Sequence, residues 1–217
     1  MQKNHANKRK RRKMTKRRRQ QLQRRRRILG AAIILVLILA VMGVVLLLSS
    51  EETIPQTVMV YPMEYTGLIR ENAAAFGLDP AHVASVILAE SAYNPQAVSN
   101  VNAQGLMQIM PDTGQWLAGK FKEDYIEGSL FDPETNIRYG CWYLGFLMDR
   151  YNGDIACASV AYHSGQGNVD KWLKDPAYSL DGRTFHTIPG ERATVYVNRI
   201  LEYSEKYVEL YNEEIAA

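Results

Sequence analysis

The chain has 217 residues and a formal net charge of +3, but this charge is the sum of two unlike parts. Residues 1–27 carry fifteen Lys or Arg and no acid, whereas residues 28–217 carry 11 basic and 23 acidic residues, a balance of −12. Because residues 28–217 are net negative, their charge does not attract them to an anionic polymer. The sequence has no Cys/His cluster suited to zinc and no D-x-D-x-D-G loop suited to calcium, so we expect no metal and no cofactor.

An uncharged segment follows the basic tail. Residues 28–48 are 21 residues without a charge, which as a helix can cross a hydrocarbon core of roughly 30 Å. We therefore expect a single transmembrane helix here. A cleaved signal peptide is the alternative, but its apolar region would span about 7–15 residues and precede an A-x-A site, which this sequence lacks.

The basic tail predicts the orientation of this anchor. Lys and Arg that flank a span remain in the cytoplasm, so residues 1–27 are expected inside the cell membrane and the chain after Ser50 on its outer face. The RKRRK and RRRR runs are compatible with nucleic-acid binding on charge alone. Their position directly before the span favours anionic lipid headgroups instead, and we expect no nucleic-acid partner.

The remainder predicts a stalk and one helical domain. Residues 49–62 are expected to form a stalk, and residues 63–217 are enough for one domain with its own core. Helical spacing of apolar residues recurs while strand-like alternation hardly appears, so the fold class expected is an all-α globule. The expected helices cover residues 63–76, 80–91, 111–120, 133–151, 154–163, 168–173 and 192–212, with the loops 99–108, 164–167 and 175–189 left to line a groove.

Two cysteines, Cys141 and Cys157, would face an oxidising compartment under this topology, so a disulfide must be considered. Measured from the Asn152-Gly153 turn, however, they lie at different heights on two antiparallel helices, with an axial mismatch of roughly 8 Å. We expect two buried thiols instead.

One acidic residue lies on an apolar helix face. Asp79 is a suitable N-cap and Pro80 a suitable first residue of a helix in which Glu90 shares a stripe with Val86 and Ile87. Burial and the negative helix C-terminus both disfavour the charged carboxylate, so the pattern predicts a general acid. The alternative is a glutamate at a frayed helix end that reaches water.

At this point the sequence resembles a known family, the soluble lytic transglycosylases, which are lysozyme-like enzymes that cleave peptidoglycan glycan strands. Five segments carry the resemblance in the expected order: E-S-A-Y-N-P from Glu90, G-L-M-Q-I-M-P from Gly105, D-P-E-T-N-I-R-Y-G-C-W-Y-L from Asp132, A-Y-H-S-G-Q-G-N-V from Ala161 and Y-V-N-R-I from Tyr196. The resemblance implies a lysozyme-like helical domain, which would be preceded here by the single anchor.

The resemblance also implies roles for individual residues. Glu90 matches the catalytic acid, and Tyr196 matches the tyrosine that hydrogen-bonds the catalytic carboxyl. The residues expected to bind the substrate are Ser99, Gln108, Met110, Tyr162, His163 and Tyr196. Tyr162 and Tyr196 could equally be packing aromatics if the residues alone are considered.

Two positions depart from the family pattern. His163 stands where the family usually has a substrate-facing asparagine; it can still donate a hydrogen bond, although a solvated loop histidine without a role is the alternative. Arg192-Ala193 stands where the family often has Glu-Thr, with Glu191 one place earlier, and this changes the expected polarity of the groove.

No second catalytic carboxylate stands out, because Asp112, Asp132 and Glu134 occupy helix starts where capping explains them. The resemblance implies that the C6 hydroxyl of N-acetylmuramic acid is the nucleophile and that a 1,6-anhydro sugar is formed. The sequence thus predicts a membrane-anchored peptidoglycan lytic transglycosylase. The alternatives are a hydrolytic muramidase and a catalytically decayed glycan-binding or cell-envelope assembly scaffold.

Overall fold

The computed structural model describes residues 61–216 and isolated positions between residues 24 and 40. The chain divides into two compact units, residues 1–54 and 55–217. No helix among the described residues has both the length and the apolar character needed to cross a bilayer. Most residues of the expected basic tail (1–27), of the expected anchor (28–48) and of the stalk (49–62) lie outside the described residues.

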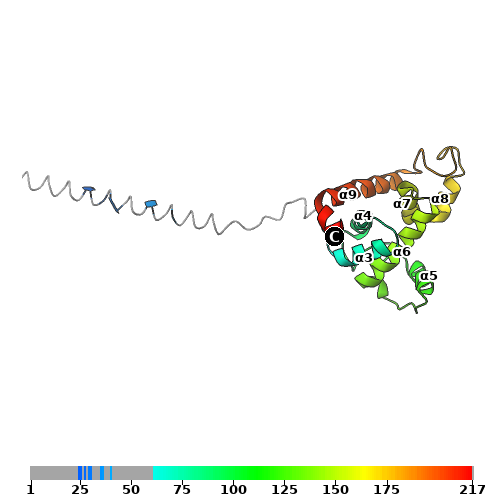
Figure 1. The fold of residues 1–217 in the computed structure, drawn as a ribbon, viewed down its shortest axis with the longest axis horizontal. Helices are drawn as coiled ribbons and strands as arrows, with labels where there is room; N and C mark the ends of the chain where they lie inside the picture. Colours follow the sequence, from blue (N-terminus) through cyan, green and yellow to red (C-terminus); the bar gives the residue numbers. More distant parts are fainter. Residues whose placement is uncertain are drawn as a thin grey trace, which may run out of the picture. The chain divides into compact units, whose positions relative to one another are not determined.

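Residues 61–216 form helices joined by loops and contain no β-strand, only two isolated bridges, which confirms the all-α fold class (Figure 1). The elements are α3 (Thr66–Ala75), α4 (Pro80–Ser91), α5 (Pro111–Phe121), the short 3-10 helix η1 (Ser129–Phe131), α6 (Pro133–Arg150), α7 (Ile155–Ser164), α8 (Gln166–Trp172) and α9 (Glu191–Ala216).

Aspartate side chains cap the N-termini of three of these helices. Asp79 Oδ1 accepts a hydrogen bond from Ala81 N at 2.8 Å, which confirms the start predicted for α4. Asp132 caps α6 in the same way. Asp154 caps α7 through Cys157 N at 2.7 Å. A cap of this kind contributes about 1 kcal/mol, so these helix starts are set by the sequence itself.

Other boundaries differ from the expectation for local backbone reasons. Helix α3 starts at Thr66 because Tyr65 has a left-handed backbone, with φ of 57°. The loop expected at 164–167 shrinks to Gly165, since α8 already begins at Gln166. Helix α9 runs beyond residue 212, with a break at Tyr211.

Helix α4 is the central helix of the domain. Its most extensive contacts are with α9, and it also packs on α3 (Figure 1). Residues 81–87 are all buried, so the helix is surrounded by protein along this stretch. Its last turn, which carries Glu90, is half-buried. The core therefore holds the middle of the helix, and its C-terminal turn with Glu90 lies toward the surface.

Cys141 and Cys157 are both buried free thiols, in agreement with the expectation from their spacing. Burial raises the pKa of both thiols, that of Cys157 to about 12. They are packing residues rather than reactive groups.

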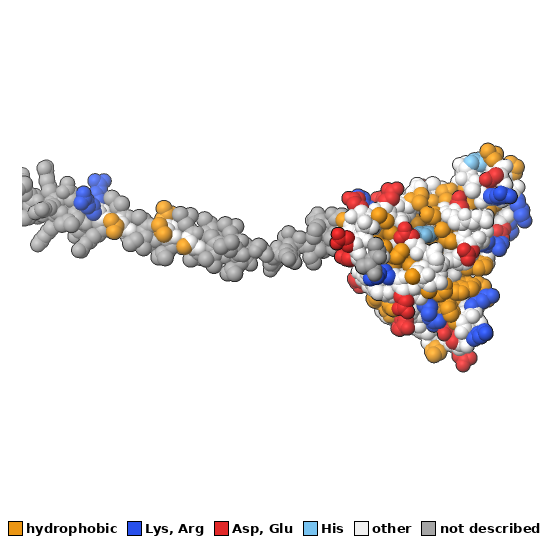
Figure 2. Space-filling model, viewed as in Figure 1, with side chains coloured by type: hydrophobic (Ala, Val, Ile, Leu, Met, Phe, Trp, Pro, Cys, Tyr) orange, Lys and Arg blue, Asp and Glu red, His pale blue; other side chains and the backbone are white. Residues whose placement is uncertain are grey.

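The face of the domain that Figure 2 draws gives no electrostatic indication of the site. On the face drawn in Figure 2, acidic and basic side chains lie scattered among one another. The site must therefore be located from the geometry of individual side chains.

Candidate active site

Glu90 lies at the C-terminal end of α4, where the central helix reaches the surface. The Tyr196 hydroxyl, on α9, donates a hydrogen bond to Glu90 Oε1 at 2.7 Å. The two residues are 106 positions apart in the sequence, and the close packing of α4 on α9 brings them together. Tyr196 is only 7% exposed, so the bond forms where water has little access.

The environment of Glu90 changes its acidity. Burial disfavours the anion, and the hydrogen bond from Tyr196 partly compensates; together they raise the pKa of Glu90 to about 7. Neither cause is a neighbouring carboxylate. A carboxyl with this pKa is present in both protonation states near neutral pH and can donate a proton and later take one back.

The loop between α4 and α5, which is expected to form one wall of the substrate groove, is built by backbone pairing. Gln104 pairs with Val98 on one side and with Ile109 on the other. A single side chain, Asn136, then fixes this loop to α6. It accepts a hydrogen bond from Met107 N at 2.7 Å and donates to Gln104 O at 2.9 Å. The loop is consequently held by the domain core.

Gly105 explains why this loop can approach α6 so closely. Its φ is 76°, and a Cβ at this position would lie 2.1 Å from Leu130 O and 2.3 Å from Asn136 Nδ2. Neither contact is sterically tolerable, so only glycine fits. Gly105 and Asn136 belong to segments that carried the family resemblance, but their structural role was not recognised from the sequence.

Ser99, Gln108 and Met110 all lie in or next to this wall. Ser99 Oγ accepts a hydrogen bond from Ala103 N at 3.0 Å. Gln108 Nε2 donates to Gly105 O at 2.9 Å, and its own φ is 49°. Met110 is 39% exposed and directly precedes α5. The polar pair thus shapes the loop, and their expected contacts with a substrate remain predictions.

Helix α7 contributes two further residues near the Glu90–Tyr196 pair. The Tyr162 hydroxyl donates to Met107 O at 2.8 Å and so links α7 to the loop. The His163 ring stacks on the Tyr196 ring, with 4.6 Å between centroids and 18° between planes. Lost hydration and the positive charge of Arg192 lower the pKa of His163. His163 is therefore next to the Glu90–Tyr196 pair and mostly neutral at pH 7.

The carboxylates considered in the sequence have other roles in the structure. Asp132 accepts hydrogen bonds from both the backbone and the side chain of Thr135. Asp112 and Glu134 lie in the first turns of α5 and α6. Glu123 binds Arg138 and Tyr139. Glu90 is thus the candidate acid among the described residues.

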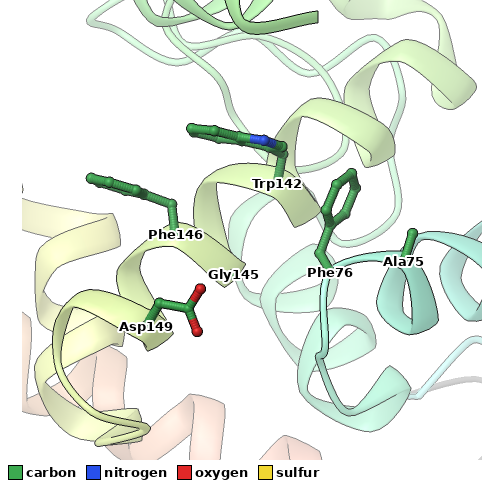
Figure 3. Close-up of a pocket in the computed structure, with 6 residues that line it drawn as sticks. All are labelled: Ala75, Phe76, Trp142, Gly145, Phe146 and Asp149. Carbon is green, nitrogen blue, oxygen red and sulfur yellow. The ribbon is translucent and has the colours of Figure 1, made fainter.

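A cavity elsewhere in the domain is lined by none of the residues expected at the active site. A cavity of about 340 Å³ between α6 and the end of α3 is lined by Ala75, Phe76, Trp142, Gly145, Phe146 and Asp149. Figure 3 shows the parallel rings of Trp142 and Phe146 on α6, with the Asp149 carboxylate one turn further along the helix. None of the expected site residues lines this cavity.

The fold and this site define a class of protein: a lysozyme-like helical domain that presents a single acid at the end of a buried helix. The family model of the transglycosylase SLT domain matches residues 67–183, more than half of the chain. The chain therefore belongs to the transglycosylase SLT domain family.

Named relatives agree with this assignment. The soluble lytic murein transglycosylase of Salmonella typhimurium is 34% identical over 150 residues, which cover 68% of this chain and 23% of that protein. The membrane-bound lytic murein transglycosylase C of Actinobacillus pleuropneumoniae is 30% identical over 181 residues, covering 70% of this chain and 48% of that protein. The chain thus spans less than half of either relative.

Solved structures show the same fold. The lytic transglycosylase Slt of Pseudomonas aeruginosa, solved as an inactive mutant, matches 70% of this chain and 25% of its own, with a TM-score of 0.64 and 33% identity. The 70 kDa soluble lytic transglycosylase of Escherichia coli matches 69% of this chain and 25% of its own, with a TM-score of 0.62 and 30% identity. The lysozyme-like fold expected from the resemblance is confirmed.

Proposed function

We propose that this protein is a peptidoglycan lytic transglycosylase that cleaves the β-1,4 bond between N-acetylmuramic acid and N-acetylglucosamine without consuming water. The observation that carries the proposal is the Glu90–Tyr196 pair: one half-buried carboxyl with a pKa of about 7, whose shift involves no second carboxylate. A glycosidase that activates water, or that forms a glycosyl-enzyme, ordinarily needs two carboxyl groups. A site with one acid suits a reaction in which the substrate provides the nucleophile.

In the proposed mechanism, protonated Glu90 first donates its proton to the glycosidic oxygen, and the bond from this oxygen to C1 of the muramic acid breaks. The Glu90 carboxylate then accepts the proton of the C6 hydroxyl of the same sugar while the C6 oxygen bonds to C1. The products are a 1,6-anhydromuramic acid end and a free 4-hydroxyl on the glucosamine. Tyr196 holds the carboxylate in place between the two steps.

The walls on either side of Glu90 are proposed to bind the glycan strand. Ser99, Gln108 and Met110 would contact it from the loop, and Tyr162 and His163 from α7, with Tyr196 beside the acid. Support comes from the geometry: Tyr162 and Asn136 both bind the backbone of Met107, so the loop and α7 form one connected frame.

The decisive test is digestion of purified sacculi followed by mass spectrometry of the soluble muropeptides. Anhydromuramic ends are expected from the wild type and none from Glu90→Gln. If the muramic ends are reducing, the protein is a hydrolytic muramidase. If neither protein cleaves but both bind glycan, the scaffold function replaces the proposed one.

We further propose that residues 28–48 anchor the protein in the cell membrane, with residues 1–27 in the cytoplasm near anionic lipid headgroups and the SLT domain on the outer face. The isolated described positions in this segment are helical, and Leu29, Leu35 and Val36 are exposed, as a lipid-facing helix requires. In intact spheroplasts, external protease should digest the SLT domain and spare a tag at residue 1. Protection of the domain would reject this topology.

The expected stalk would keep the domain close to the membrane, where cell-envelope assembly machinery is a candidate partner. Residues 51–62, twelve residues of this stalk, reach at most about 40 Å when extended. Lengthening the stalk within residues 51–60 should move cleavage away from membrane-proximal strands. If cleavage is unchanged in cells that carry a doubled stalk, the stalk does not restrict the domain to membrane-proximal strands.

A further inference from the structure

Arg192 and His163, from two different helices, both lie near Tyr196, the residue that binds the candidate acid. Arg192 precedes Tyr196 by four residues in α9, and helical residues with this spacing share a face. The face of α9 that carries Tyr196 to Glu90 therefore carries Arg192 one turn nearer the helix start. His163, from α7, stacks on the Tyr196 ring at 4.6 Å. Both side chains are exposed and thus available to a ligand.

Arg192 has no charged side-chain partner within residues 61–216, as is also true of Arg70, Arg183 and Arg199, whereas two other arginines are paired. Arg138 pairs with Glu123 at 2.7 Å and Arg150 with Asp170 at 2.6 Å. Within residues 61–216, no ion pair and no side-chain hydrogen bond involves Arg192. Its neighbour Glu191 does not share its helix face, because consecutive helical residues point in different directions.

The charge of Arg192 nevertheless acts on the site. It lowers the pKa of His163, so the guanidinium lies within electrostatic reach of that ring. The start of α9 adds partial positive charge from its free backbone N–H groups. A guanidinium fork and a neutral imidazole N–H are both donors, and the fork matches a carboxylate in geometry and charge.

The substrate of the proposed function carries charge on only one of its two sugars. N-acetylglucosamine is neutral, whereas muramic acid carries a lactyl group that ends either in a free carboxylate or in a stem peptide with carboxylates of its own. We propose that Arg192 and His163 form a subsite that binds a carboxylate carried by the muramic acid residue next to the bond that is cleaved. This inference rests on the proposed function and adds a charge preference to it.

The test uses the full chain in detergent and three kinds of glycan strand: bare strands with free lactyl carboxylates, the same strands after conversion of these carboxylates to methyl amides, and strands that retain their stem peptides. Arg192→Gln should raise KM about tenfold on carboxylate-bearing strands, as expected for one lost charge-assisted contact, with kcat unchanged. On amidated strands it should have no effect. Lys174→Gln, which removes an exposed charge after α8, is the matched control and should change neither constant.

The pattern of losses identifies the carboxylate. A loss on bare strands assigns the lactyl group, and a loss only on peptide-bearing strands assigns the stem. An equal loss on amidated strands, or no loss on any strand, overturns the inference. If the wild type cleaves none of the strands, the proposed function fails; binding of fluorescent bare and amidated oligosaccharides to wild type and Arg192→Gln then still decides whether the charge preference exists.

Discussion

Tyrosines at the two ends of α9 donate hydrogen bonds to different kinds of acceptor. At the acid end, which comprises Glu90, Tyr196 and His163, the Tyr196 hydroxyl donates to a carboxyl group. At the clasp end, which comprises Tyr61, Pro62, Tyr207 and Tyr211, hydroxyls donate to backbone carbonyls. Tyr207 binds Pro62 O at 2.7 Å and Tyr211 binds Tyr61 O at 2.6 Å.

This difference in acceptor separates chemistry from structure. A backbone carbonyl cannot change its charge, so the clasp bonds contribute only to stability and hold the segment before α3 against α9. The Glu90 carboxyl changes charge near pH 7, so the strength of its bond to Tyr196 changes during a proton transfer. Tyr61 and Pro62, expected at the end of the stalk, thus belong structurally to the domain.

The largest effect is expected from Glu90→Gln at the acid end. It should lower turnover of sacculi by about 10³-fold, within the range ascribed to general acid–base groups. Release of anhydromuropeptides is the measurement. Residual turnover within tenfold of the wild type would show that another group supplies the proton.

The same variant tests the pKa of Glu90 through stability. The folded pKa of about 7 lies above the ordinary value of 4.5, so the folded state binds more protons than the unfolded state between these pH values. Wild-type stability should therefore fall as pH rises through this window, by up to about 3 kcal/mol, and Glu90→Gln should not show that fall. Urea unfolding at pH 5 and pH 8 measures both slopes; parallel slopes would mean that the Glu90 pKa is ordinary.

At the clasp end, Tyr207→Phe should lower stability without lowering activity. Tyr207 is completely buried, and removing its hydroxyl leaves Pro62 O without its donor, at a cost of about 2 kcal/mol. Thermal unfolding should shift down by roughly 4–8 °C, while kcat at 25 °C stays unchanged. A loss of kcat without a loss of stability would end the proposed separation between the two ends.

Tyr196→Phe should lower activity about tenfold at pH 7 and raise the pKa of Glu90, because the hydrogen bond that stabilises the anion is lost. Since the acid must be protonated, the decline of kcat/KM at high pH should move to higher pH. A shift to lower pH would show that Tyr196 acts on the carboxyl in a different way.

Tyr211→Phe should give the smallest effect, about 1 kcal/mol of stability, because Tyr211 lies at a break in α9 and is 8% exposed. Denaturant titration of Tyr211→Phe and Tyr207→Phe under the same conditions shows which of the two hydrogen bonds contributes more to stability. A larger loss than in Tyr207→Phe would place the main support of the clasp at Tyr211.

Helical spacing and capping residues were enough to predict the position of Glu90. The α4 boundaries match the expectation because Asp79 and Pro80 set the helix start through local bonds. The pairing of Tyr196 with Glu90 was available only through the family resemblance, since no local rule links residues 106 positions apart. The role of Asn136 was missed because its three partners, Met107 N, Gln104 O and Leu130 O, lie on a loop and on the short helix η1, whose positions the sequence does not predict.

The sequence by itself determined where the helices begin, which face of α4 is apolar and which carboxyl lies on that face, because these properties depend on neighbours within a few residues. Only the tertiary structure decided how far burial raises the pKa of Glu90 and that His163 stacks on the tyrosine that binds this carboxyl. Hydration and hydrogen bonding at Glu90 depend on α9 and α7, which pack against α4 only in the folded chain.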